Sequence, residues 1–206
     1  MDPLETYNAL PLSIDPSTKA ISSTDPALAR EIEELNQMAR MFVTLDTPNQ
    51  VPPPPAPVKP QRSATVNKMR EAGNKALGLQ NYKEAIEMYN HGIKAASERP
   101  AWEASGLVRE ELSTLYNNRA QALMSAPDQR YPEAAIDAEI SVEMKKVGNV
   151  KAWYRRGYCL REMGRLQEAA DWVKSGLDLE RMGPEKGNIG QLESLLRDIE
   201  KAIGQK

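Results

Sequence analysis

Three segments of the chain share one pattern, in which a large apolar residue is followed three positions later by an alanine and then by apolar residues at helical spacing. They are NYKEAIEMYNHGI from Asn81, RYPEAAIDAEISV from Arg130 and RLQEAADWVKSGL from Arg165. Their alanines, Ala85, Ala134 and Ala169, lie 49 and 35 residues apart. A period of this size is typical of stacked helix pairs, because one pair cannot bury its apolar face alone. The sequence therefore predicts an all-α solenoid.

The longer first interval is explained by inserted residues. SERPAWEASG lies between the first and second repeats, and the turn SAPDQR is longer than its equivalents. Further helical patterns begin near Thr65, Leu107 and Val150, and NIGQLESLLRDIEKAI carries apolar residues on one side only. Residues 63–206 are thus predicted to form three antiparallel helix pairs and a C-terminal capping helix.

Small residues recur where such helices would cross, and with the repeats they make this segment resemble a tetratricopeptide repeat domain. They are Gly73, Ala120 and Gly157 in the first helices and Ala85, Ala134, Ala169, Gly92, Ser141 and Gly176 in the second helices. Gly73 lies inside the helical stretch KMREAGNKAL, where glycine costs about 1 kcal/mol relative to alanine. We expect close helix packing to offset this cost. The resemblance implies a concave groove lined by the first helix of each pair.

Residues 1–47 form a separate N-terminal arm in our interpretation. Asp25 and Pro26 are a helix-start signal, and the following segment to about residue 43 is predicted to be helical. One apolar stripe runs along it, made of Leu28, Ile32, Leu35, Ala39 and Phe42. A single helix cannot bury this stripe, so the arm is predicted to dock on a partner or on the larger domain. Upstream, LPLSIDPSTKAIS has the alternation of a small strand or hairpin.

Between the arm and the repeats lies a proline-rich linker, residues 48–62. The run NQVPPPPAPVKPQ contains six prolines between Pro52 and Pro60. Proline fixes φ and lacks a backbone donor, so this segment is predicted to be an extended spacer. A docking site for a proline-reading domain is the alternative.

Composition excludes several classes of protein. The net charge of −2 argues against a general nucleic-acid binder. Cys159 is the only cysteine and His91 the only histidine, so we expect no internal disulfide, no metal site, no cofactor and no catalytic set. No long apolar run or secretory signal is present, which predicts a protein on the cytosolic side without direct membrane insertion.

Five polar residues of the predicted first helices form a candidate binding site. Arg70 and Asn74 are four apart and share one helix face, as do Lys151 and Arg155, and Asn118 lies on the middle first helix. Two cations on one face repel each other, which a bound anion would reverse. This set resembles the two-carboxylate clamp of chaperone-binding tetratricopeptide domains, which grip an acidic C-terminal tail. By this resemblance Arg70 stands where lysine is usual, Asn74 and Asn118 match the two amides, and Lys151 and Arg155 match the two cations.

Leu77 and Met124 are candidates for an apolar shelf under the tail's preceding side chain, with core packing as the alternative. The whole architecture resembles the tetratricopeptide subunit of the fungal Sec translocation complex at the endoplasmic reticulum. That resemblance implies a non-enzymatic adaptor, peripheral on the cytosolic face of this membrane. Its groove would bind cytosolic Hsp70 tails to deliver precursors after translation. Its arm would bind a membrane-anchored Sec partner through Leu28, Ile32, Leu35 and Phe42. A soluble Hsp70/Hsp90 co-chaperone is the alternative.

Overall fold

The computed structural model describes residues 10–43, 60–99, 103, 105–183 and 189–205. The side chains of residues 42, 43 and 60 lie outside this description. The chain divides into two compact units, Met1–Pro57 and Val58–Lys206, and each is described by itself. The predicted linker falls largely on residues 44–59, outside the described residues.

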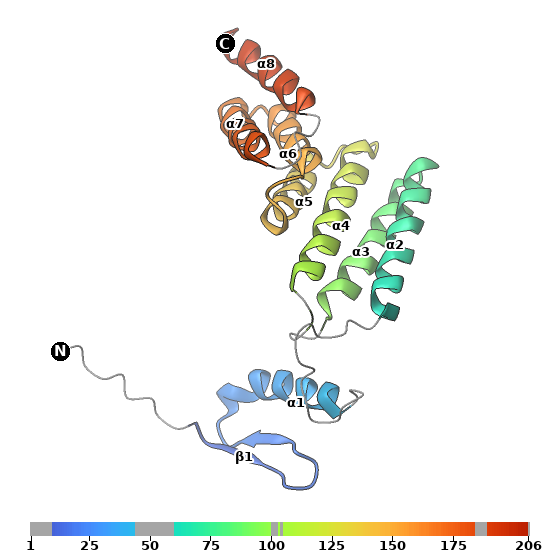
Figure 1. The fold of residues 1–206 in the computed structure, drawn as a ribbon, viewed down its shortest axis with the longest axis vertical. Helices are drawn as coiled ribbons and strands as arrows, with labels where there is room; N and C mark the ends of the chain where they lie inside the picture. The colour runs from blue at the N-terminus through green and yellow to red at the C-terminus, as the bar shows by residue number, and fades with distance from the viewer. Residues whose placement is uncertain (1–9, 44–59, 100–102, 104, 184–188, 206) are drawn as a thin grey trace, which may run out of the picture. The chain divides into compact units, whose positions relative to one another are not determined.

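The first unit contains a two-stranded antiparallel hairpin followed by a helix (Figure 1). Strand β1 (Leu12–Ile14) pairs with β2 (Ile21–Ser23), with Ile14 opposite Ile21. The Asp15 carboxylate holds the connecting turn, accepting hydrogen bonds from the N–H groups of Ser17 and Thr18 at 2.8 and 2.7 Å. The alternation in the sequence therefore forms a hairpin, closed by a side chain that caps its own turn.

A short 3-10 helix (Pro26–Leu28) leads into α1 (Ala29–Val43). Asp25 is the N-cap of the 3-10 helix, because its carboxylate accepts from the Ala27 N–H at 2.9 Å, and Pro26 follows directly. Asn36 joins α1 to β2: its amide accepts from Ile21 N at 2.7 Å and donates to Ile21 O at 2.9 Å. The helix therefore covers one edge of the hairpin through a single side chain.

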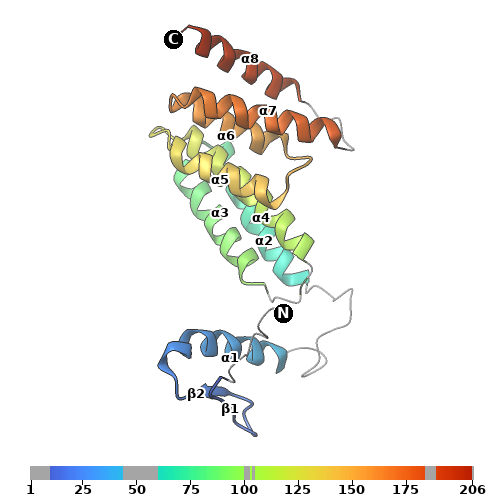
Figure 2. The same ribbon diagram turned by 90° about the vertical axis from the view of Figure 1, so that its left-hand side faces the viewer.

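The second unit is a stack of helix pairs in chain order, and the fold-class prediction is confirmed (Figures 1 and 2). Each helix packs against the next in sequence, and α6 also contacts α4 and α8. The first helices of the pairs are α2 (Pro60–Gly78), α4 (Ser105–Ser125) and α6 (Val150–Glu162). The second helices are α3 (Tyr82–Ser97), α5 (Tyr131–Met144) and α7 (Leu166–Met182), and α8 (Gly190–Gly204) is the last helix.

The predicted start of α2 near Thr65 was wrong. The helix begins at Pro60, so residues 60–62 belong to it rather than to the linker. The last proline of the run therefore occupies the first helical position, where its missing N–H is not needed and its fixed φ suits the helix. The start of α4, predicted near Leu107, is at Ser105.

The small residues at the helix crossings are buried, as predicted. A Cβ built on Gly176 of α7 would lie 2.7 Å from Cδ2 of Trp153 on α6, which is too close for any side chain. Trp153 is 4% exposed and belongs to the core formed by α5 to α8. Glycine at this crossing therefore lets the indole ring fill the space between the two helices of the third pair.

The insertion between the first two pairs contains a buried ion cluster. The Arg99 side chain is 1% exposed, and its guanidinium contacts Glu103 at 2.5 Å and Glu111 of α4 at 2.7 Å. It also donates to the Ser63 hydroxyl of α2 at 2.9 Å. One arginine thus ties the insertion to the first helices of two pairs, with its charge balanced by carboxylates.

Candidate peptide-binding groove

Two adjoining cavities are lined mainly by α4, α6 and α8. One, of about 460 Å³, is bordered by Asn118 and Asn117 of α4 and by Lys151 of α6. The other, of about 400 Å³, is bordered by Gln121 of α4, by Lys151 and Arg155 of α6, and by α8. Lys151 and Gln191 border both cavities, so the two form one groove. We call this surface the groove.

The five predicted clamp residues lie on three helices; Asn118, Lys151 and Arg155 border the groove, whereas Arg70 and Asn74 are not among the residues that line it. Arg70 and Asn74 lie on α2, Asn118 on α4, and Lys151 and Arg155 on α6. The Asn118 amide Nδ2 donates to Asn74 Oδ1 at 3.0 Å, which joins the first two helices directly. Burial raises the pKa of the Tyr89 hydroxyl to about 12, and the nearby charges of Arg155 and Arg70 partly oppose this rise. Both cations therefore lie within electrostatic range of the same buried hydroxyl.

Arg155 differs from the other well-packed arginines because it has no carboxylate partner among the described residues. Its Nε donates to Gln121 Oε1 at 3.0 Å, and its Nη1 donates to the Asn117 carbonyl at 3.0 Å and to the Asn117 side-chain oxygen. All of these acceptors are neutral. Burial lowers the pKa of its guanidinium to about 10. An anion that binds beside a desolvated cation held only by neutral groups gains a strong electrostatic attraction.

Arg119 provides the contrast within the same part of the fold. Its guanidinium binds Asp137 through two hydrogen bonds of 2.7 and 2.6 Å, and the Asp137 side chain is 4% exposed. This pair is internally neutral and leaves no charge for a ligand. The comparison separates an arginine with a structural role from Arg155, whose charge is uncompensated.

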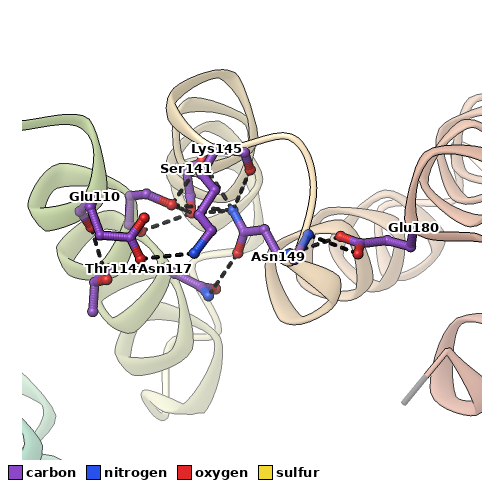
Figure 3. A network of polar contacts seen from close by, with 9 residues as sticks. Glu110, Thr114, Asn117, Ser141, Lys145, Asn149 and Glu180 are labelled. Atoms are coloured by element: carbon purple, nitrogen blue, oxygen red, sulfur yellow. Dashed lines mark hydrogen bonds and ion pairs between the residues drawn. The ribbon is translucent and has the colours of Figure 1, made fainter. Parts of the chain in front are cut away.

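A buried polar network fixes the start of α6, and with it Lys151 and Arg155 (Figure 3). Asn149 is its centre: its amide donates to the Ser141 carbonyl at 3.1 Å and to the Lys145 carbonyl at 3.0 Å. The fully buried Glu180 carboxylate of α7 accepts from the Gly148 and Asn149 N–H groups at 2.9 and 2.8 Å. The Glu180 carboxylate thus accepts from backbone N–H groups at the N-terminus of α6, which have no partner within the helix.

The same network reaches the groove through Asn117. Its amide donates to Asn149 Oδ1 at 3.4 Å (Figure 3). Its side-chain oxygen accepts from Arg155. On the cavity rim, Lys145 is paired with Glu110 at 2.8 Å, so its charge is already balanced. Lys151, which is exposed, has no ion pair to a described residue. The uncompensated positive charge of the groove is therefore concentrated on Lys151 and Arg155.

Asn74 and its neighbour Gly73 both contact one buried tyrosine, Tyr89. The Tyr89 hydroxyl of α3 donates to Asn74 Oδ1 at 2.8 Å. A Cβ on Gly73 would lie 2.4 Å from Cε1 of the Tyr89 ring. Because Tyr89 is 0% exposed, its ring cannot move into solvent to make room. The glycine and the asparagine of KMREAGNKAL are thus explained by the same side chain.

Sequence reasoning missed Tyr89, Asn117 and Gln121. Tyr89 follows Ala85 by four residues, which places it on the buried face of α3, and it was assigned no role beyond that pattern. Gln121 is four residues after Asn117, so the two share a face of α4, a spacing that could have indicated a joint partner. Their partner, Arg155, is on another helix, and local spacing does not reveal it.

The remaining predicted residues are placed as follows. Leu77 and Met124 are half-buried and pack against core clusters, and neither is among the residues that border the two cavities. In the arm, Leu28 and Ile32 are half-buried and Leu35 is 41% exposed. Phe42 belongs to α1, but its side chain is outside the description.

A metal site and a membrane-spanning helix are both absent from the described parts of the chain. No three His, Cys, Asp or Glu side chains there come together in a way that could hold a metal ion. None of the described helices combines the length and the apolar character that a membrane span requires.

Comparisons with known proteins agree with the helical-repeat fold. A sequence profile of the tetratricopeptide repeat matches residues 150–181, which cover α6 and most of α7. The ER protein translocation subcomplex subunit sec67 of Schizosaccharomyces pombe is 35% identical over 149 residues, which cover 71% of this chain and 76% of that protein. The chain belongs to the sec67 family. For other curated relatives that match, the chain spans only 11% to 35% of their length.

Solved structures resemble this sec67-family chain in fold. A chain of the Sec complex from S. cerevisiae aligns with a TM-score of 0.68 at 20% identity, over 94% of this chain and 98% of that one. The second tetratricopeptide domain of human RPAP3, solved in complex with the HSP70 peptide SGPTIEEVD, aligns with a TM-score of 0.51 at 25% identity. This alignment covers 68% of our chain and 98% of the human domain.

Proposed function

We propose that the chain is a non-enzymatic adaptor of post-translational protein translocation on the cytosolic face of the endoplasmic reticulum. Its groove binds the acidic C-terminal tail of cytosolic Hsp70 chaperones, and its N-terminal arm binds a membrane-anchored Sec subunit. The uncompensated Arg155 beside Lys151 is the observation that carries the first part. Membership of the sec67 family supports the second.

The groove suits a ligand with two carboxylates at its end. An ionised terminal aspartate only accepts hydrogen bonds, so its receptor must supply donors from several directions. Asn74 and Asn118 offer amide N–H groups from α2 and α4, and Lys151 and Arg155 offer charged donors from α6. The HSP70 peptide in the RPAP3 complex ends in such an aspartate. Charge-assisted hydrogen bonds contribute about 1.5–3 kcal/mol each, which is enough for micromolar binding once the ordering of a flexible tail is subtracted.

The binding test uses the full chain and the peptide SGPTIEEVD in isothermal titration calorimetry. We expect a micromolar dissociation constant that rises with salt, since the contacts are ionic. Arg155→Ala and Asn118→Ala should abolish binding and leave the helical circular dichroism unchanged. Arg181→Ala is the matched control, because Arg181 lies on α7 outside the groove and pairs with Glu193. Retained affinity in Arg155→Ala would reject the clamp.

A C-terminally amidated peptide distinguishes binding of the α-carboxylate from binding of the acidic side chains. Amidation of the peptide's C-terminus removes the α-carboxylate and keeps every acidic side chain. We expect this change to abolish binding as the Arg155 substitution does. An amidated peptide that binds with full affinity would mean that the groove reads acidic side chains rather than a chain end.

The arm has the surface that a second partner requires. None of residues 10–41 is buried, although the segment folds into a hairpin and a helix. Leu12, Ile14 and Leu35 are 44%, 63% and 41% exposed. Because Asn36 occupies the backbone groups of Ile21 on the outer edge of β2, the free edge of the hairpin is β1. An extended segment of the Sec partner can pair with β1 and cover its apolar side chains.

The arm is tested by co-sedimentation of the full chain with microsomes. Ile14→Glu places a charge on the exposed apolar surface and should release the protein, whereas Ser22→Glu on β2 should not. Deletion of residues 1–47 should also release it, without changing the affinity for the peptide. A deletion variant that remains bound to microsomes would show that the arm is not the anchor.

A further inference from the structure

We propose that Tyr89 is a positioning residue for peptide binding: its hydroxyl fixes the orientation of the Asn74 carboxamide so that the amide N–H groups remain free for the ligand. This inference rests on the proposed function, because Tyr89 acts through a residue of the clamp. It assigns a role in recognition to a side chain of α3, a helix that contributes no residue to the groove.

The contacts of Asn74 define its orientation. Its Oδ1 accepts from the Tyr89 hydroxyl at 2.8 Å and from Asn118 Nδ2 at 3.0 Å. No hydrogen bond joins its own Nδ2 to a described residue. The acceptor end of the amide is therefore used within the protein, and the donor end is available.

This orientation matters because an amide can be turned over. An asparagine side chain presents an oxygen acceptor at one end and two N–H donors at the other. The donor end of the amide attracts a carboxylate, and the oxygen end repels it. A hydrogen bond to Oδ1 from inside the fold selects the attractive orientation before the ligand arrives, so binding does not have to supply that ordering.

Tyr89 can do this because it is held more firmly than Asn118. Tyr89 is 0% exposed, and its ring packs directly over Gly73, where a Cβ would lie 2.4 Å from the ring. Asn118 is only half-buried, borders the cavity and can itself turn toward a ligand. When Asn118 bonds the peptide, the Tyr89 hydroxyl is the donor that remains on Asn74.

A buried tyrosine hydroxyl needs a partner in any case, so the test must separate positioning from mere satisfaction of the hydroxyl. Tyr89→Phe removes the oxygen and keeps the ring. Calorimetry with SGPTIEEVD should show affinity reduced by about three- to tenfold, the equivalent of one ordinary hydrogen bond. Tyr116→Phe is the matched control, because the Tyr116 hydroxyl of α4 has no hydrogen bond to a described residue.

The decisive comparison places both substitutions in one chain. In an Asn74→Ala background, Tyr89→Phe should cause no further loss of affinity, because the group that it positions is gone. If Tyr89→Phe weakens binding equally with and without Asn74, its effect is structural and the proposal is overturned. Unchanged affinity in the single variant overturns it as well.

A second measurement needs no ligand and keeps this inference separate from the proposed function. The side-chain amide resonances of Asn74 in a ¹⁵N-labelled full chain should shift in Tyr89→Phe and stay in place in Tyr116→Phe. Unshifted resonances would disprove the hydrogen bond, whatever the peptide does. If the wild type does not bind the peptide although these resonances shift, the proposed ligand fails and Tyr89 has no recognition to serve, which also overturns its assigned role.

Discussion

Helix propensity and packing predict opposite signs for Gly73→Ala. Alanine inside α2 should stabilise the helix by about 0.8–1.0 kcal/mol relative to glycine. In the folded protein, however, the new Cβ would lie 2.4 Å from Cε1 and 2.7 Å from Cδ1 of Tyr89. Forcing a methyl group into a packed core costs about 1–3 kcal/mol. If the ring shifts, the 2.8 Å bond from its hydroxyl to Asn74 is also strained, at about 0.5–1.5 kcal/mol.

The combined effect is a loss of about 2 kcal/mol in the free energy of unfolding. This corresponds to a decrease of roughly 4–8 °C in the melting temperature for a domain of this size. Urea denaturation followed by circular dichroism at equal protein concentration measures it. Gly106→Ala is the matched control, because Gly106 lies in α4 with no atom within 4 Å of its built Cβ. Its stability should equal or exceed that of the wild type, by up to about 1 kcal/mol, because only the propensity gain applies there.

A Gly73→Ala variant as stable as the wild type would refute this reasoning. It would mean that the packing cost is no larger than the helix-propensity gain of about 0.8–1.0 kcal/mol, and the tight crossing of α2 and α3 would then not explain the glycine. The peptide affinity of the same variant is an independent readout. We expect it to fall, because displacement of the ring takes the hydroxyl away from Asn74.

Three other regions give independent predictions. Asp137→Ala leaves the Arg119 guanidinium without its carboxylate and should cost about 3 kcal/mol of stability in urea denaturation; a loss below about 1 kcal/mol would contradict a structural ion pair. Burial raises the pKa of the Cys159 thiol to about 12, so it should resist thiol-specific disulfide reagents in the folded protein and react in urea. Rapid modification without denaturant would argue against this burial. The Ser17 hydroxyl and nearby N–H groups hold the pKa of Asp15 well below its usual range. A folded-state pKa below the unfolded value stabilises the turn at pH values above the unfolded pKa, and this stabilisation is lost as the pH falls through the folded-state pKa. At about pH 3 the Asp15 carboxylate should therefore still be ionised, which carbon NMR can measure.

Most of the fold could be predicted from the three sequence repeats. The alanines at 85, 134 and 169 and the glycines at crossings such as Gly176 indicated helix pairs, since only small residues permit such close approach. The boundaries were less accurate, and α2 begins at Pro60 because a proline can start a helix as well as end a linker. The hairpin of the arm followed from short alternation around Asp15 and Pro16.

The repeats predicted which helices carry the five candidate clamp residues, whereas the clamp itself rests on the family resemblance. Neither indicated which of their hydrogen-bond donors are free. The hydrogen bond from Tyr89 to Asn74 joins residues 15 apart in sequence, and that from Asn118 to Asn74 joins residues 44 apart. Such contacts depend on how one helix lies across another.

The sequence by itself therefore determined the solenoid and the helices that carry the clamp residues, because periodicity and residue size act locally along the chain. Only the tertiary structure decided that Arg155 is held by the neutral oxygens of Asn117 and Gln121 while Arg119 is neutralised by Asp137. Two arginines with the same chemistry differ in this way because the partner comes from a different helix in each case. The charge left for a ligand is a property of the packed pairs.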